Sequence, residues 1–188
     1  VNAMTTAQVA ALTTGQVQSL STSTVGGIST TNVKALGAAQ VGALTTTAVA
    51  QLSTSQVAAL TTKQVAALTT GAVAALSTGQ VKALTSTQVQ GLTTAGLNAM
   101  TTTQVAALTT SQVSSLTDTQ VAGLSTGTLQ SLSTTQVASL TDAQVKALTT
   151  TEVAAMTTAQ VSALTAAQLG VMSTDDILAL GTAQVSAL

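Results

Sequence analysis

Residues 60–68 read LTTKQVAAL, and variants of this run recur without a slip of register along the whole 188-residue chain. A large aliphatic residue returns at every eighth position from Met4 to Leu188. A second aliphatic residue lies five positions after each of these, and it is valine except at Leu97, Leu129, Leu169 and Ile177. The chain is therefore a series of about 23 octads with the consensus Leu-Thr-Thr-x-Gln-Val-Ala-Ala.

Because this register never breaks, the sequence predicts a single repeat array over residues 1–188 rather than separate domains. The chain opens in the middle of an octad and closes on the first residue of another. We therefore expect the array to be a fragment of a longer one.

Geometry decides among the secondary structures that an octad could form. Side chains alternate between the two faces of a strand, so the two aliphatic positions would point in opposite directions. In one continuous α-helix, eight residues turn the chain through about 800°, and the apolar seam would drift by roughly 80° per repeat. Both a β-solenoid and a long rod-like helix are therefore disfavoured.

Each octad instead carries the signals that begin a helix of its own. Its second residue is Ser or Thr except at Gly37 and Gly181, and these residue types are preferred at the N-cap. Gln follows three residues later in most octads, which completes a capping box. The aliphatic residues then fall at N′ and N4, as Leu12 and Val17 do around Thr13, which is the spacing of a hydrophobic staple. We predict an all-α solenoid with one very short helix per octad.

The few charged residues agree with this register, because a helix dipole favours acids in the first turn and lysines in the last. The acidic residues fall in the first turn of the expected helices, at Asp118, Asp142, Glu152, Asp175 and Asp176. Three lysines fall in the last turn, at Lys34, Lys82 and Lys146, and Lys63 is the exception.

A second, weaker period indicates how many octads make one coil. The capping glutamine is replaced at four positions that are each three octads apart, namely Thr24, Ala48, Ala72 and Gly96. After one longer interval of four octads it is replaced again at Thr128, Glu152 and Asp176, and Asn32 lies outside the pattern. A 24-residue coil of three octads is the expected architecture. A 16-residue coil of two octads is the alternative.

Composition argues against an active site. The chain has no His, Cys, Phe, Tyr, Trp or Pro, and only four lysine or arginine and five acidic residues. A nucleophilic Ser or Thr needs a base, so we predict that the protein is not an enzyme and has no catalytic, cofactor-binding or metal-binding residues and no cofactor. Asp175 and Asp176 are interpreted as helix-start acids, since Ca²⁺ takes about six or more oxygen ligands. Local crowding explains Gly26, Gly27 and Gly91 better than a phosphate loop does.

Charge and hydropathy also restrict the partners. A net charge of −1 offers no basic field for nucleic acid. The apolar runs are far shorter than the roughly 20 residues that cross a bilayer. We therefore expect the neighbouring repeats of the same chain to be the partners of each octad, with no nucleic acid and no membrane insertion. A protein or surface partner is left open.

The run LTTxQVAAL, which covers essentially the whole chain, resembles the octapeptide repeat tracts of very large secreted or cell-surface bacterial proteins that are often described as adhesin-like. This resemblance implies an extracellular or cell-surface location and a structural role. It carries over no functional residue.

Two functions follow as hypotheses. The first is a structural spacer or stalk that projects another domain from a cell surface. The second is a binding module that uses one face of the solenoid for ice, a glycan or a protein partner. The repeated Thr-Thr pairs are the basis for the second hypothesis, although the first Thr of each pair is already expected to cap a helix.

Overall fold

The computed structural model describes residues 3–188, and the regular secondary structure of this part of the chain is helical. It contains 23 helices, each of four to six residues, and no strand. One helix falls in each octad. The predicted fold class, an all-α solenoid of very short helices, is therefore confirmed.

Residue contacts divide the chain into two compact units, Val1–Ala107 and Leu108–Leu188, and each is described by itself. The first unit holds α1 (Thr6–Ala10), α2 (Thr14–Gln18), α3 (Thr22–Gly26), α4 (Thr30–Ala35), α5 (Ala38–Gly42), α6 (Thr46–Ala50), α7 (Thr54–Ala59), α8 (Thr62–Ala66), α9 (Thr70–Ala74), α10 (Thr78–Ala83), α11 (Ser86–Gly91), α12 (Thr94–Asn98) and α13 (Thr102–Ala107). The second holds α14 (Thr110–Ser114), α15 (Asp118–Ala122), α16 (Thr126–Gln130), α17 (Thr134–Ala138), α18 (Asp142–Ala147), α19 (Thr150–Ala155), α20 (Thr158–Ser162), α21 (Ala166–Val171), α22 (Thr174–Ala179) and α23 (Thr182–Val185). That residues 1–188 form one array stays a prediction.

The octad signals begin each helix as predicted, and α8 is typical. The Thr61 hydroxyl accepts the backbone N–H of Gln64 at 3.2 Å, and Gln64 Oε1 accepts the N–H of Thr61 at 2.6 Å. The N–H of Val65 donates to the carbonyl of Thr61 at 3.0 Å and closes the first turn. Leu68 then donates its N–H to the carbonyl of Val65 at 3.1 Å, three residues back, and this tighter turn ends the helix.

The chain turns each corner with extended residues. In the corner between α7 and α8, Leu60 has φ −60° and ψ 143°, and Thr61 has φ −77° and ψ 159°. No residue in the described part of the chain has a positive φ. The corners therefore need no glycine, and the N′ and N-cap residues that staple and cap the next helix also make the turn.

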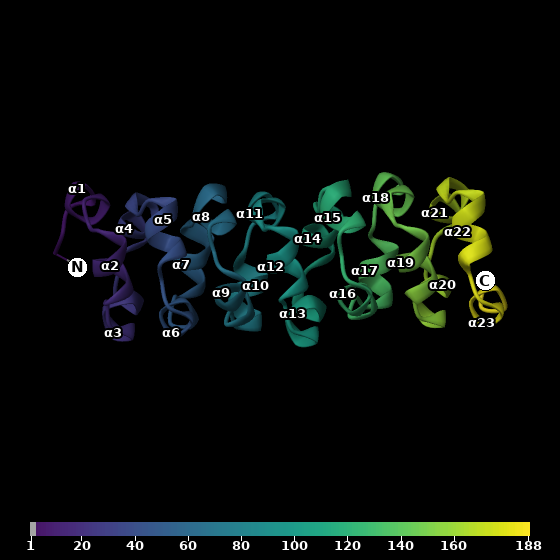
Figure 1. Cartoon of the computed structure of the whole chain (residues 1–188), viewed down its shortest axis with the longest axis horizontal. Helices are drawn as coiled ribbons and strands as arrows, with labels where there is room; N and C mark the ends of the chain where they lie inside the picture. The colour runs from purple at the N-terminus through teal and green to yellow at the C-terminus, as the bar shows by residue number, and fades with distance from the viewer. Residues whose placement is uncertain (1–2) are drawn as a thin grey trace. The chain divides into compact units, whose positions relative to one another are not determined.

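Three helices make one coil. The helices in extensive contact are three places apart in chain order, as α5, α8 and α11 are in the first unit and α15, α18 and α21 in the second. Figure 1 shows α5, α8 and α11 following one another along the upper edge, and α3, α6 and α9 along the lower edge. The predicted coil of three octads is therefore confirmed, and the alternative coil of two octads is wrong.

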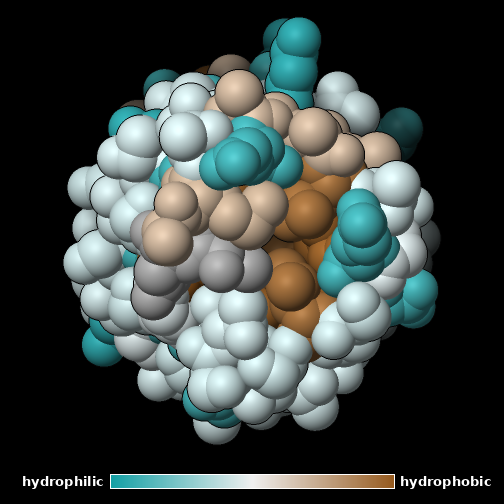
Figure 2. Space-filling model, turned by 90° about the vertical axis from the view of Figure 1, so that its left-hand side faces the viewer, coloured by the Kyte–Doolittle hydropathy of each residue, from teal (hydrophilic) through white to brown (hydrophobic). Residues whose placement is uncertain are grey.

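The core is a column of aliphatic side chains inside the coils. At N4, Val57 and Val137 have exposed fractions of 0%, and at N′ Leu60 and Leu132 have exposed fractions of 5%. Figure 2 looks onto the N-terminal end of the first unit and shows apolar residues near the centre of a rim of weakly hydrophilic ones. With one such pair per octad, a coil buries its apolar side chains only when another coil covers it.

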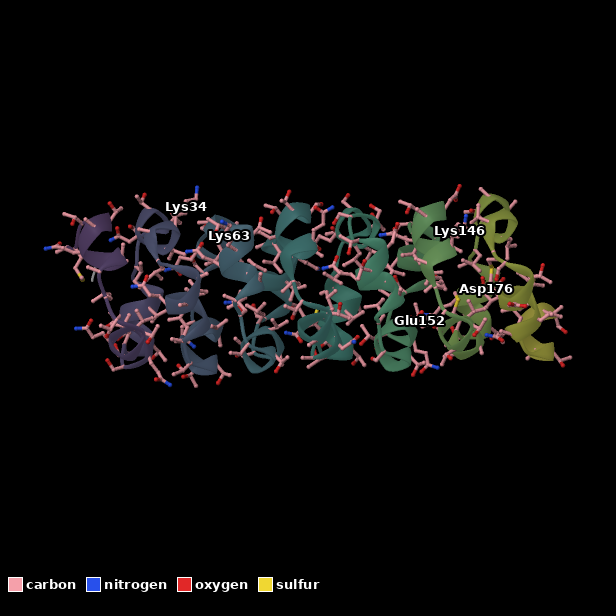
Figure 3. The ribbon with its side chains drawn as sticks, turned by 45° about the horizontal axis from the view of Figure 1, so that its top comes forward. Lys34, Lys63, Lys146, Glu152 and Asp176 are labelled. Carbon is pink, nitrogen blue, oxygen red and sulfur yellow. The ribbon has the colours of Figure 1, made fainter. Side chains whose placement is uncertain are left out.

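The charged residues lie in the turns that the dipole argument assigned to them. The acids of the first turns are Asp118, Asp142, Glu152, Asp175 and Asp176. The predicted lysines of the last turns are Lys34, Lys82 and Lys146. The lysines labelled in Figure 3 are all exposed. This agreement confirms the register independently of the aliphatic pattern.

Replacing the N-cap of α14 should test that register directly. The Thr109 hydroxyl accepts the N–H of Gln112 at 3.2 Å, so Thr109→Ala should destabilise α14 by about 1 kcal/mol. Thr110 occupies N1, and Thr110→Ala should be neutral or slightly stabilising because alanine is the better helix former. Hydrogen exchange of the α14 amides measures both effects. Equal losses in the two variants would show that the register is wrong.

Candidate functional site: the glutamine seams

Most of the polar side chains that this fold buries in the described residues are glutamines at N3. Gln80 and Gln144, for example, have exposed fractions of 2% and 1%. A carboxamide buried to this extent is costly unless its oxygen and nitrogen both find hydrogen-bond partners. These glutamines therefore mark the principal polar site of the molecule.

One glutamine joins two coils. Gln80 Oε1 accepts the N–H of Ser77, the N-cap of its own helix α10, at 2.6 Å. Gln80 Nε2 donates to the carbonyls of Val49 and Leu52, 31 and 28 residues earlier, at 3.0 and 2.6 Å. Val49 lies in α6 and Leu52 in the corner before α7, the helix on which α10 packs. The amide thus caps the start of one helix and satisfies the end of another in the preceding coil.

The same bond recurs with little variation. In eleven glutamines the Nε2 atom lies 2.6–2.8 Å from the carbonyl oxygen 28 residues earlier. We call each stacked row of such residues a glutamine seam. The first unit has the seams Gln56–Gln80–Gln104 and Gln40–Gln64–Gln88, and the second has Gln144–Gln168 and Gln136–Gln160–Gln184.

The third row of N3 residues in the first unit has no glutamine. It consists of Thr24, Ala48, Ala72 and Gly96, on α3, α6, α9 and α12. This row therefore forms no glutamine seam. The coils come close elsewhere, between α5 and α8, which carry Gln40 and Gln64, since a Cβ atom built on Gly42 would lie 2.8 Å from the carbonyl oxygen of Ala67 at the end of α8.

Crowding also accounts for two of the glycines that the sequence singled out. A Cβ atom on Gly91 would lie 2.5 Å from Thr62 Cγ2 and 3.0 Å from the Thr62 carbonyl oxygen. A Cβ atom on Gly26 would lie 3.3 Å from the carbonyl oxygen of Gln51. The prediction of local crowding is confirmed at both positions.

In the second unit the row of N3 residues without glutamine lies on α16, α19 and α22. It carries oxygen-bearing side chains, Thr128, Glu152 and Asp176. Glu152 Oε2 accepts the N–H of Thr149 at 2.7 Å, and Asp176 Oδ2 accepts the N–H of Ser173 at 3.0 Å. Both acids therefore act as helix-start acids, as predicted for Asp176. Within residues 3–188 no three His, Cys, Asp or Glu side chains gather in a way that could hold a metal ion. The absence of catalytic and cofactor-binding residues stays a prediction.

Capping, which the sequence pattern predicts for the N3 glutamine, accounts for only its side-chain oxygen, and the amide nitrogen has a second role in the seam. A capping box accepts Glu as readily as Gln, yet N3 is Gln in 15 octads and Glu in one. Capping uses only the side-chain oxygen, so this preference for the amide was the signal that the NH₂ group has a partner elsewhere. The identity of that partner depends on the coil of three helices, because the acceptor carbonyls lie 28 and 31 residues earlier in the chain.

These features define the class of protein, an α-solenoid of octapeptide repeats whose main polar site is the interface between its own coils. A family model described as the ALTTAQ repeat matches residues 41–70, 66–94, 94–126, 119–150 and 153–188. The chain therefore belongs to the ALTTAQ repeat family. No curated protein matches it. None of the helices in the described residues is long and apolar enough to cross a membrane.

Removing a seam amide should cost more than removing a capping amide. Gln80→Leu removes the side-chain donor from the Leu52 carbonyl, while the Val49 carbonyl keeps the N–H of Leu52, and this should cost about 1–3 kcal/mol beyond the lost cap. Gln16 makes the capping-box bonds and no seam bond within the described residues, so Gln16→Leu is the matched control. Hydrogen exchange in α7 and α10 for the first variant, and in α2 for the second, measures the difference. Similar losses would contradict the seam.

Two glycines at the same octad position should respond oppositely to alanine. Gly42→Ala places a methyl group 2.8 Å from the Ala67 carbonyl oxygen and should destabilise the first unit by about 1–3 kcal/mol. Gly170 has no other atom within 4 Å of its Cβ position. Gly170→Ala should therefore stabilise α21 by about 0.5–1 kcal/mol. Denaturant midpoints measure both, and stabilisation by Gly42→Ala would show that the coils are further apart.

Proposed function

We propose that this chain is a structural spacer or stalk of a bacterial surface or secreted protein and that it has no catalytic activity. The support comes from where its recurring polar groups are used. The N3 amides bond to the backbone of the preceding coil, and the N-cap hydroxyls bond within their own helices. The recurrent polar chemistry of the octad therefore serves to hold the chain together.

The observation that carries the proposal is the repetition of one seam bond from coil to coil. The helices in extensive contact belong to adjacent coils, so the stability of such an array is a sum of local terms. Adding or removing a whole coil then changes the length of the array while leaving every remaining interface intact. A spacer needs this property, since its length can vary without loss of the fold.

The location outside the cell rests on the resemblance of the LTTxQVAA run to octapeptide tracts of large secreted and surface proteins. A sparsely charged, polar exterior suits such a segment. The N1 and N2 positions of most octads carry Thr, Ser, Ala or Gly, and they are largely exposed. Small, neutral residues of this kind offer few anchors for a tight interface, in which large aromatic and Arg side chains usually dominate.

The alternative function is a binding face, and one row of threonines is the specific basis for it. The N1 residue is Thr in every helix of the stack α1, α4, α7, α10 and α13, and all five side chains are exposed. They are Thr6, Thr30, Thr54, Thr78 and Thr102. In the second unit Thr126, Thr150 and Thr174 occupy the equivalent positions on α16, α19 and α22. A regular hydroxyl row of this kind is the surface that an ice-binding solenoid would use.

Changing the number of coils tests the spacer. Deleting residues 126–149 removes three octads and preserves the row of every other helix, so small-angle scattering should show the maximum dimension falling by about 8–10 Å, one interhelical spacing. Deleting residues 126–133 instead moves each later helix to another row and should destabilise the second unit. A reporter fused to one end of the immobilised chain should drop in height by the same 8–10 Å or so in the first variant. An unchanged height would exclude a spacer.

Surface substitutions separate the two functions. Thr103→Ser and Ser111→Ala should leave the reporter height unchanged, because a spacer depends on length and not on these side chains. Ice binding would give the 188-residue chain a gap between its melting and freezing points. Thr102→Tyr and Thr126→Tyr would abolish that gap while the helical circular dichroism remained. Such a result would contradict the spacer function and support a binding module.

A further inference from the structure

The charged side chains are divided unequally between the two units. The first unit, Val1–Ala107, has three lysines and no acid, which gives it a side-chain charge of +3 at pH 7. The second unit, Leu108–Leu188, has five acids and one lysine, which gives it a side-chain charge of −4. The net charge of −1 therefore combines two parts of the chain that have opposite signs.

Most of these charged side chains lie on the surface. The exposed ones are Lys34, Lys63 and Lys82 in the first unit and Asp118, Asp142, Lys146 and Asp175 in the second. Figure 3 labels three of the lysines, Lys34, Lys63 and Lys146. Within residues 3–188 no ion pair joins a lysine to an acid. The exposed charges can therefore pair with groups of another molecule without breaking a contact inside this one.

In each unit, charges of one sign follow a single row of helices. Lys34 and Lys82 are the N5 residues of α4 and α10, which both pack on α7. Asp118 and Asp142 are the N1 residues of α15 and α18, which pack on each other. Because packed helices lie about 8–10 Å apart, each pair forms a short line of like charge along its unit.

The helix dipole explains only part of this pattern. It favours acids at the start of a helix and lysines near its end, and it does so in every octad alike. It therefore accounts for the position of each charge within its octad, but it gives no reason for the confinement of the acids to residues 118–176. A separation of signs is what two surfaces need in order to recognise each other by charge.

We propose that two copies of this chain associate, with the first unit of one copy against the second unit of the other. Each copy carries a surface of either sign, so a second copy complements both units. In a pair with two-fold symmetry the same contact forms twice, which doubles the number of ion pairs. A net charge of only −1 adds little general repulsion between the copies.

The contact is weak and sensitive to salt, because charge is its main source of attraction. An exposed ion pair contributes little by itself, so association depends on several pairs that form together. The chain has no aromatic residue and no Arg, and these are the side chains that usually dominate tight interfaces. Pairing of this kind leaves the coils of each copy intact, so it is independent of the spacer function.

Sedimentation equilibrium of the full chain at pH 7 tests the association. In about 10 mM NaCl, where the Debye length is about 30 Å, the weight-average mass should rise with concentration towards that of two chains, with a dissociation constant below about 1 mM. In about 1 M NaCl, where the Debye length is about 3 Å, the chain should be a monomer. A monomer at both salt concentrations, or equal association at both, overturns the proposal.

Two triple variants with the same net charge separate charge complementarity from net charge. The first combines Lys34→Gln, Lys63→Gln and Lys82→Gln, which removes three positive charges, makes the first unit neutral and brings the net charge from −1 to −4. The second combines Thr110→Glu, Thr134→Glu and Thr158→Glu, which adds three negative charges to the second unit and also brings the net charge from −1 to −4. These threonines are exposed N1 residues, where an acid is favoured by the helix dipole.

The two variants should behave differently at low salt. The glutamine variant should remain a monomer, because its first unit has lost the positive charge. The glutamate variant should associate at least as strongly as the parent chain, because its units keep opposite signs. Helical circular dichroism checks that both are folded. If the glutamine variant associates as the parent chain does, the lysines are not the contact and the proposal is rejected. If neither variant associates, net charge decides the outcome and the proposal is likewise rejected.

Discussion

The structure depends on the bond between the N3 amide and the carbonyls at the end of a helix in the preceding coil. A helix leaves its first four N–H groups and last four carbonyls without partners inside the helix, and a helix of five residues such as α8 consists of little else. The capping box satisfies groups at the start. The seam satisfies groups at the end, so one-turn helices persist where isolated ones would not form.

The three rows of the coil divide this task unequally. In the first unit two rows are glutamine seams, and the third has Thr24, Ala48, Ala72 and Gly96. Close approach is a separate feature, since Gly42 in α5 could not take a methyl group without a shift against the Ala67 carbonyl at the end of α8. The rows thus differ in whether an N3 amide joins neighbouring coils, and the octads are similar without being identical.

Because the seam bond recurs from coil to coil, the function proposed for this protein is one that depends on its length. The N-cap hydroxyl and the N3 amide are turned to the backbone, and the exposed N1 and N2 positions carry small, neutral residues in most octads. Membership in the ALTTAQ repeat family agrees with a structural repeat protein. Glu152 is a departure of another kind, since it keeps the capping bonds and carries a second oxygen where the seam glutamines carry an amide nitrogen.

The sequence by itself determined the octad, its helix and its register, because capping and stapling act over three to five residues and are readable from one repeat. It also predicted the coil of three octads from the spacing of Thr24, Ala48, Ala72 and Gly96. Only the tertiary structure decided where Gln80 Nε2 finds its acceptors, since Val49 and Leu52 lie 31 and 28 residues away and no local pattern encodes a partner at that distance. The close approach of Gly42 to the Ala67 carbonyl, and the burial of Glu152 Oε1 without a hydrogen-bond partner, likewise arise only when one coil is stacked upon another.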